Sequence, residues 1–323
     1  MSMMDAYKPQ KRTIWKGRTE TFHKQAYWHQ IVRFLDLSDI YLDQSVYKEN
    51  TPALLGYACD EGVKRNQGRS GASSGPKAIR KLLGGLPNHN HTIIDAGNIR
   101  CIKNDMELAQ STLSDSVERL LKARLFPILL GGGHDIAYGH YSGIRNYIAS
   151  INPNAQIGII NLDAHFDLRA NTDGNTSGTP FYQIAQDCKT INIPFHYLCL
   201  GIQESSNPQY LFDTANKLEA EYMLSSEMNM QNIDRIRATL SKFMDKVDYI
   251  YLTIDLDGFS SAYAPGVSAP SPVGFSPEIA LQTIEHIKLS KKLISADIAE
   301  MNPVYDIDNH TTRLAAKLIY ALT

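Results

Sequence analysis

Three apolar runs rich in β-branched residues each end in side chains of the kind that bind metal ions. Residues 126–130 lead into Gly-Gly-Gly-His, residues 157–162 into Asp-Ala-His-Phe-Asp, and residues 247–254 into Asp-Leu-Asp. Such runs are typical of buried strands in a parallel sheet, where ligands collect beyond the carboxyl ends of the strands. These three strand ends must meet in one site, which favours a single α/β domain over two small ones.

From residue 54 onward, strand-like and helix-like segments alternate. We expect strands at 54–58, 92–96, 126–130, 157–163, 197–201, 248–255 and 293–297, and helices at 75–84, 105–124, 135–149, 179–188, 231–246, 276–289 and 309–321. This alternation predicts a three-layer αβα fold with a central, mostly parallel sheet.

The first fifty residues are polar, aromatic and weakly periodic. We expect residues 1–50 to form an N-terminal extension that packs on a single domain spanning residues 1–323. Its aromatic side chains, Trp15, Tyr27, Trp28 and Phe34, would cover the outside of the domain or contribute to an oligomer contact.

Six side chains at the three strand ends carry donor atoms suited to divalent cations. They are His134, Asp163, His165, Asp167, Asp255 and Asp257. Two imidazoles and four carboxylates suit manganese-type ions better than a thiolate-favouring metal. One ion rarely needs six such ligands, whereas two ions share bridging carboxylates, so a two-metal centre is predicted. Asp163, His165 and Asp167 would share one face if the extended backbone continued past residue 162.

Composition limits the classes of function that this chain can perform. With 323 residues, 43% of them hydrophobic, there is enough material for one large core. The formal net charge of −2 gives no support to nucleic-acid or membrane-surface binding. No apolar run is long enough to span a bilayer, and no apolar segment follows the basic N-terminal residues. We therefore expect a cytoplasmic protein with no nucleic-acid or membrane partner.

Five longer stretches carry a family resemblance. They are Gly-Gly-Gly-His at 131–134, Asp-Ala-His-Phe-Asp at 163–167, Asp-Leu-Asp-Gly-Phe and Ala-Pro-Gly-Val between 255 and 267, and Ser-Ala-Asp-Ile-Ala-Glu-Met-Asn-Pro at 295–303. Together they closely resemble the ureohydrolase family of arginases, agmatinases and formimidoylglutamases, over most of the chain from residue 56. The resemblance implies an arginase-type α/β fold, two Mn²⁺ ions per subunit and hydrolysis of a C–N bond at an amidine-like carbon.

The same resemblance implies roles for individual residues. It assigns the six ligand positions to the six side chains named above. Glu300 matches the family glutamate that orients the amidine-type group of the substrate. Asp167 is expected to hold and aim the attacking water, and to relay its proton to the leaving amine.

A loop distinguishes the branches of the family. Arginases and agmatinases carry Asn-Xaa-His-Gly after the Asp-Ala-His segment, whereas this chain has Ser177 in the place of that histidine. Residues 57–69 and 200–203 also resemble the formimidoylglutamase branch. We therefore expect hydrolysis of N-formimidoyl-L-glutamate to L-glutamate and formamide, as in histidine degradation. The alternatives are a guanidine hydrolase of the agmatinase or arginase type, and a non-catalytic, metal-poor family member.

Basic side chains near residue 65 are candidates for contacts with the substrate carboxylates. Arg65, Asn66 and Arg69 follow a predicted strand end, and a guanidinium group binds a carboxylate in a two-pronged fashion. The alternative is a solvated basic turn, in which case residues 203–207 are the next candidates.

Ser177 either contacts the substrate or acts as a turn residue before the following helix. The expected partners are a small-molecule substrate and further copies of the chain in a homo-oligomer.

Overall fold

A ten-stranded, mostly parallel sheet runs through the part of the protein that the computed structural model describes, residues 5–39, 47–89 and 92–323. The strands are β1 (Tyr7–Lys8), β2 (Arg33–Phe34), β3 (Pro52–Ala58), β4 (Ile94–Arg100), β5 (Phe126–Leu130), β6 (Ile157–Leu162), β7 (His196–Ile202), β8 (Glu221–Leu224), β9 (Tyr249–Asp255) and β10 (Leu293–Ala299). Their order is β1-β4-β3-β5-β10-β9-β6-β7-β8, and β2 also pairs with β4. Only β1 pairs antiparallel among the described strands.

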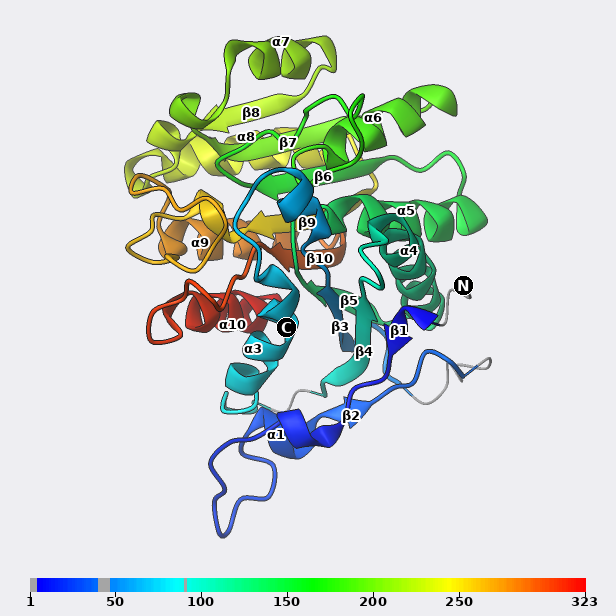
Figure 1. Ribbon diagram of the computed structural model, residues 1–323, viewed down its shortest axis with the longest axis vertical. Helices are drawn as coiled ribbons and strands as arrows, with labels where there is room; N and C mark the ends of the chain where they lie inside the picture. The colour runs from blue at the N-terminus through cyan, green and yellow to red at the C-terminus, as the bar shows by residue number, and fades with distance from the viewer. Residues whose placement is uncertain (1–4, 40–46, 90–91) are drawn as a thin grey trace.

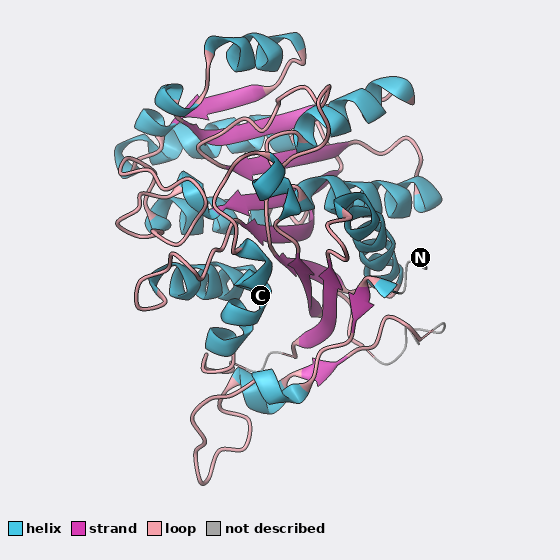
Figure 2. Ribbon diagram, in the orientation of Figure 1, coloured by secondary structure: helices cyan, strands magenta, loops and turns pink. Residues whose placement is uncertain are grey.

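Helices cover both faces of this sheet (Figures 1 and 2). They are α1 (Trp28–Ile31), α2 (Glu61–Arg65), α3 (Gly75–Leu83), α4 (Met106–Lys122), α5 (Ile136–Ile151), α6 (Pro180–Thr190), α7 (Gln209–Lys217), α8 (Ile233–Met244), α9 (Pro277–Leu289) and α10 (His310–Leu322). One layer contains α4, α5 and α6, and the other contains α3, α10, α9 and α8. The predicted three-layer α/β fold is confirmed.

Neighbouring residues of one strand supply the two halves of the core. On β6, Ile159 belongs to the cluster that includes Ile144 of α5, whereas Ile160 belongs to the cluster that includes Ile236 of α8. Successive side chains of a strand point to opposite faces, so a strand covered on both faces is apolar throughout. This explains why the central strands are visible in the sequence as unbroken apolar runs.

Each predicted strand and helix is present, with ends that differ by a few residues. The largest difference is in β4, which was expected at 92–96 and is found at Ile94–Arg100. The edge strand β8 and the helix α7 before it were missed. β8 has only four residues, and most of them are only half-buried, so it lacks the apolar run that marks the central strands.

The N-terminal extension is anchored on the edge of the sheet beside β4. The indole nitrogen of Trp15 donates a hydrogen bond to Asp95 at 2.7 Å, and Asp95 forms a fully buried ion pair with Arg80 of α3. Trp28 is also buried and stacks on Tyr320 of α10, with ring centroids 5.6 Å apart.

Of the helices in the described ranges, none is both long enough and apolar enough to cross a membrane.

Candidate metal centre and active site

The glycine stretch after β5 passes close to the end of β3. The backbone N–H groups of Gly132 and Gly133 donate to the carbonyl oxygens of Tyr57 and Cys59, both at 2.9 Å. A Cβ atom on Gly132 would collide with the carbonyl oxygen of Cys59. Only glycine permits this close approach of two backbones, which fixes where His134 enters the site.

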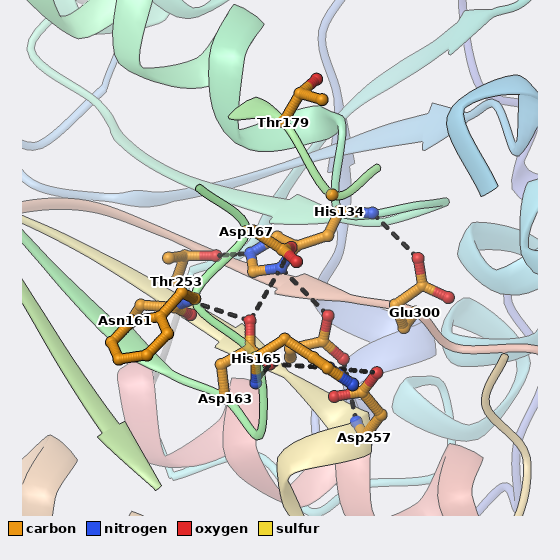
Figure 3. A network of polar contacts seen from close by, with 12 residues as sticks. His134, Asn161, Asp163, His165, Asp167, Thr179, Thr253, Asp257 and Glu300 are labelled. Carbon is orange, nitrogen blue, oxygen red and sulfur yellow. Dashed lines mark hydrogen bonds and ion pairs between the residues drawn. The ribbon is translucent and has the colours of Figure 1, made fainter. Parts of the chain in front are cut away.

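The six predicted ligands form two adjacent groups at the carboxyl ends of the central strands (Figure 3). In the first group, Nδ1 of His134 lies 3.2 Å from Asp163 and 3.0 Å from each of Asp167 and Asp255. In the second group, Nδ1 of His165 lies 3.5 Å from Asp163 and 3.3 Å from Asp257.

Asp163 connects the two groups. Its Oδ2 atom faces His134, and its Oδ1 atom faces His165. Within each group the ligand atoms all lie within 4.8 Å of one another. A carboxylate that offers one oxygen to each of two positions is the arrangement expected of a bridging ligand in a two-metal centre.

The backbone path through Asp163, His165 and Asp167 differs from the prediction. The extended conformation ends with β6 at Leu162, and Asp167 has a left-handed backbone with φ of 49°. Turns, rather than an alternating strand, bring the three side chains together, and the backbone N–H of His165 donates to Asp163 Oδ1 at 2.7 Å. The predicted cause, an extended backbone that continues past residue 162, was wrong, although the three side chains do come together.

Acidic and basic groups in the cluster change each other's ionisation. Burial would lower the pKa of His134, but the three neighbouring carboxylates outweigh it and raise that pKa well above its usual range. Burial, together with the charge of Asp163, raises the pKa of Asp167 to about 6. Burial, then the charge of Asp255, raises the pKa of Asp257 well above its usual range. The cluster therefore draws in positive charge, which protons or divalent cations can supply.

A buried hydrogen-bond chain orients His134 from behind. Its Nε2 atom lies 2.9 Å from the hydroxyl of Thr253, and that hydroxyl donates to Asp297 at 2.6 Å. Because the Thr253 proton points to Asp297, the hydroxyl accepts from Nε2–H of His134. This leaves the lone pair of Nδ1 directed at the carboxylate cluster, as metal ligation requires.

Asp297 was not predicted to take part in the site. It also accepts a hydrogen bond from Tyr251 and lies 2.6 Å from Nδ1 of His140, whose Nε2 lies 2.6 Å from Ser295. No residue near His140 in the sequence marks it as a member of this network. Its partners lie more than 150 positions away, on β10. The Ser-Ala-Asp at the start of the 295–303 motif was the available signal.

Glu300 follows β10 and lies beside the first ligand group (Figure 3). Its Oε1 atom accepts a hydrogen bond from the backbone N–H of His134 at 3.0 Å. Its Oε2 atom is buried and has no hydrogen-bond partner among the described residues. Burial, then the charges of Asp255 and Asp257, raises the pKa of Glu300 well above its usual range.

A cavity of about 330 Å³ opens above the cluster. The predicted residues Asn66, Arg69, Ser177 and Glu300 line it, together with ligand residues of both groups. The guanidinium of Arg69 donates from Nε to the Ser268 carbonyl at 2.9 Å and from the second terminal nitrogen to the Val267 carbonyl at 2.6 Å. Of the alternative segment 203–207, Ser206 and Asn207 also line the cavity.

Arg65 lies elsewhere. Its guanidinium donates to Glu107 at 2.6 Å and 3.1 Å and to Glu61 at 3.3 Å, and the residue does not line the cavity. Arg65 occupies the last turn of α2, so its side chain turns toward α4 rather than toward the ligands. We therefore remove Arg65 from the candidate substrate contacts.

Arg169 is a cavity residue that the sequence did not single out. It donates from one terminal nitrogen to the hydroxyl of Tyr210 at 2.7 Å. A Cβ atom on Gly178 would lie 3.1 Å from the Arg169 side chain, so this glycine leaves room for the arginine. The available signal was its position two residues after Asp167, in the segment that turns across the site.

Comparisons with known proteins agree with this geometry. The model of the arginase family matches residues 50–323. A formimidoylglutamase of Chromobacterium violaceum is 44% identical over 96% of this chain and 97% of its own length. One of Clostridium tetani is 41% identical over 98% of this chain and 95% of its own length.

Solved structures show the same fold. A formimidoylglutamase of Bacillus subtilis has a TM-score of 0.80 at 25% identity, covering 95% of this chain and 93% of its own. A formiminoglutamase of Trypanosoma cruzi, solved with Mn²⁺, has a TM-score of 0.73 at 24% identity and covers 84% of this chain and 92% of its own. With the family model matched over most of its length and relatives above 40% identity, this chain belongs to the arginase family.

Proposed function

We propose that this protein is a formimidoylglutamase, which hydrolyses N-formimidoyl-L-glutamate to L-glutamate and formamide. The proposal rests on the cavity above the candidate metal ligands. The two ligand groups and Glu300 lie at its base, and the guanidinium groups of Arg69 and Arg169 are in its lining. This arrangement suits a substrate with a cationic amidine at one end and two carboxylates at the other. The full-length relatives above 40% identity carry the same activity in their names.

Two Mn²⁺ ions fit the donors of the cluster. Nδ1 of His134 and Oδ1 of Asp257 are buried, and neither has a hydrogen-bond partner in the described ranges. A purely nitrogen and oxygen donor set with four carboxylates favours hard divalent ions. When bound, such a pair of ions acts as a Lewis acid and makes water a nucleophile near neutral pH.

Glu300 is placed to orient the reacting group of the substrate. The hydrogen bond from the His134 backbone fixes one carboxylate oxygen, and the other is buried without a partner among the described residues. A cationic formimino nitrogen would satisfy that second oxygen with a charge-assisted hydrogen bond. This contact would hold the amidine carbon within reach of the attacking water.

Asp167 is the candidate proton carrier. One of its oxygens faces His134, and the residue lines the cavity above the two ligand groups. The second oxygen of the carboxylate would accept the proton from water and pass it to the glutamate nitrogen as the C–N bond breaks.

Arg169 and Arg69 are candidates to bind the substrate carboxylates, in different ways. Arg69 already uses two guanidinium nitrogens on backbone carbonyls, so it has one terminal nitrogen to offer. Arg169 uses only one terminal nitrogen, on Tyr210, which leaves the Nε side of its guanidinium to grip a carboxylate with two hydrogen bonds. We therefore place the tighter carboxylate contact on Arg169.

A substrate panel tests the proposal. The purified protein, supplied with Mn²⁺, is incubated with formimidoyl-glutamate, arginine, agmatine and guanidino acids, while formamide, urea and ammonia are followed separately. We expect formamide from formimidoyl-glutamate and no comparable urea from any guanidine. Urea as the main product would replace the proposal by a guanidine hydrolase. A protein that binds no metal and turns over nothing would indicate the non-catalytic alternative.

We also propose that the enzyme is a cytoplasmic homo-oligomer. Val304 and Ile307, which follow β10, are 68% and 66% exposed and offer apolar surface to another copy. Analytical ultracentrifugation of the Mn²⁺-loaded protein would test the oligomer, and fractionation of the source cells would test the location.

A further inference from the structure

A second cavity lies apart from the ligand cluster and has a volume of about 780 Å³. Its walls are the N-terminal segment at residues 8–16, the start of α3, and the ends of β3 and β4. Six of its lining residues are cationic: Lys8, Lys11, Lys16, Lys77, Lys81 and Arg100. No aspartate or glutamate is among the described residues that line it.

This concentration of positive charge is local. The chain as a whole has a formal net charge of −2, so the positive charge of this cavity is offset elsewhere in the chain, in large part by the buried acids of the ligand cluster. In the described part of the chain, none of the six cations forms an ion pair. Like charges that share a concave surface repel each other, and the field is focused into the cavity. An anionic ligand would relieve this repulsion.

Arg100 provides an independent sign of a ligand. Its Nε atom is buried and has no hydrogen-bond partner among the described residues, and one terminal nitrogen makes a long bond of 3.3 Å to the Asp5 carbonyl. A buried donor without an acceptor is costly, more so when it is charged. Because Arg100 lines the cavity, an anionic ligand there would lie beside its guanidinium and offset the cost of its burial.

Ser74 is a neutral donor on the wall opposite the N-terminal segment, whereas the hydroxyl of Ser73 already donates to Asp60 at 3.2 Å. Ser74 occupies the N-cap position of α3, yet its side chain makes no capping hydrogen bond. It lines the cavity with Ser73 and Pro76, so the first turn of the helix borders this space. The N-terminus of a helix favours negative charge through its dipole, although Pro76 supplies no N–H group in this first turn and the N–H of Gly75 donates to the Ala72 carbonyl.

The size of the cavity and the spacing of its charges narrow the class of ligand. A volume of several hundred Å³ is typical of small-molecule sites. Six cations distributed over two walls exceed what a single carboxylate or phosphate needs. A long nucleic acid would need basic surface beyond these walls, and the formal net charge of −2 gives that no support. We propose that this cavity binds a small metabolite that carries several phosphate groups, at a site separate from the catalytic cavity.

Inorganic tripolyphosphate is a suitable probe, and matched lysine variants give the test. The double variant K77A/K81A removes two exposed lysines one turn apart on α3. The control K189A/K242A removes two exposed lysines of α6 and α8, outside the cavity. Binding is measured by equilibrium dialysis on the Mn²⁺-loaded protein, with metal content determined after each point. All three proteins keep the ligand cluster, so any chelation of Mn²⁺ is common to them.

We expect one tripolyphosphate per chain for the wild type and the control, and a Kd at least roughly tenfold higher for K77A/K81A. Turnover without tripolyphosphate should be equal in all three proteins, which shows that they are folded. Equal affinity of the double variant and the control would overturn the proposal, as would no saturable binding to the wild type. Citrate that binds as tightly would overturn the assignment to phosphate, and a tighter acidic peptide would overturn the assignment to a small molecule.

Discussion

Two buried polar clusters lie back to back in this protein, and they differ in how completely their atoms are paired. Around Asp297, the carboxylate accepts from Tyr251 and Thr253 and contacts His140, whose other nitrogen contacts Ser295. In the ligand cluster, four carboxylates face two imidazoles, and buried atoms of His134, Asp257 and Glu300 have no hydrogen-bond partner within the described residues.

The comparison shows how a buried polar group can be assigned to structure or to function. A paired network is complete without any ligand and stabilises one arrangement of the core. An unpaired set of buried acids is unfavourable unless a cation joins it. Thr253 connects the two clusters, because its hydroxyl donates to Asp297 and accepts from His134. The paired cluster therefore supports the geometry of the unpaired one.

The largest expected effect is on activity when the unpaired cluster loses an acid. In D257A, one metal position loses a ligand whose pKa is already raised by burial and by Asp255. We expect turnover to fall by roughly a thousandfold or more and metal content to approach one ion per chain. The metal-free variant should be at least as stable as metal-free wild type, because burial and Asp255 disfavour the Asp257 carboxylate by more than its contact with His165 favours it. Normal turnover with full metal content would refute the ligand assignment.

Replacing Asp297, the acid of the paired cluster, by alanine should instead mainly lower the stability of the protein. D297A removes the acceptor of Tyr251 and Thr253 and leaves His140 without its carboxylate. Breaking such a buried pair costs about 3–5 kcal/mol in the free energy of unfolding. Chemical denaturation of metal-free proteins compares D297A with D257A directly. If both variants unfold at the same denaturant concentration, the distinction between the clusters fails.

The third expected effect is that the stability of the metal-free protein depends on pH, and that Mn²⁺ reverses this dependence. His134 and His165 have raised pKa values, and the acids Asp167 and Asp257 do as well. In each case the folded state binds protons that the unfolded state releases at a lower pH. The metal-free protein should therefore lose stability as pH rises through these folded-state values, by at most about 1.4 kcal/mol per pH unit for each proton.

Mn²⁺ replaces these protons, so its affinity should increase over the same pH range. Thermal unfolding with chelator and with Mn²⁺, in a series of buffers, measures both trends. A metal-free protein whose stability keeps rising above about pH 6, the folded-state pKa of Asp167, would contradict the proposed charge balance of the cluster.

The central strands and the meeting of the six candidate ligands were predictable because their signals are local in sequence. An unbroken apolar run marks a strand that is buried on both faces, and β5 was expected at its observed bounds. The ligands follow these strands directly, so the parallel sheet places them together. What could not be predicted was the turn that gives Asp167 a positive φ, because it depends on contacts beyond the strand.

The partners of arginine and histidine side chains were the hardest features to predict. Arg65 and Arg69 are four residues apart, yet one pairs with Glu107 on α4 and the other contacts the carbonyl of Val267. Such partners are brought near by tertiary structure alone. The same reason hid the pairing of His140 with Asp297, which joins α5 to β10.

A smaller effect is expected where the two clusters meet. T253V keeps the shape of the side chain but removes the hydroxyl that accepts from His134. Loss of such a supporting contact typically costs ten- to a hundredfold in metal affinity. Mn²⁺ titration with a competing chelator measures it, and T253S, which keeps the hydroxyl, should recover most of the affinity. Unchanged affinity in T253V would show that the chain from Asp297 does not orient His134.

The last prediction applies the comparison of paired and unpaired groups to Arg65 and Arg169. Arg65 is satisfied by Glu107 and Glu61, whereas Arg169 in the cavity keeps the Nε side of its guanidinium for a substrate carboxylate. A charge-assisted, two-pronged contact contributes about 1.5–3 kcal/mol. R169A should therefore lower kcat/KM for formimidoyl-glutamate by roughly ten- to a hundredfold, mainly through KM, while metal content stays unchanged.

R69A should have a smaller effect, because Arg69 offers one nitrogen and also supports the loop at Ser268. R65A should change kcat/KM by no more than about twofold, since exposed ion pairs contribute little. Steady-state kinetics of the three variants decide the order. If R65A lowers kcat/KM as much as R169A does, the basic loop that contains Arg65 and Arg69 acts as one unit on the substrate. Hydrogen-bond pairing in the structure would then not distinguish structural from functional arginines.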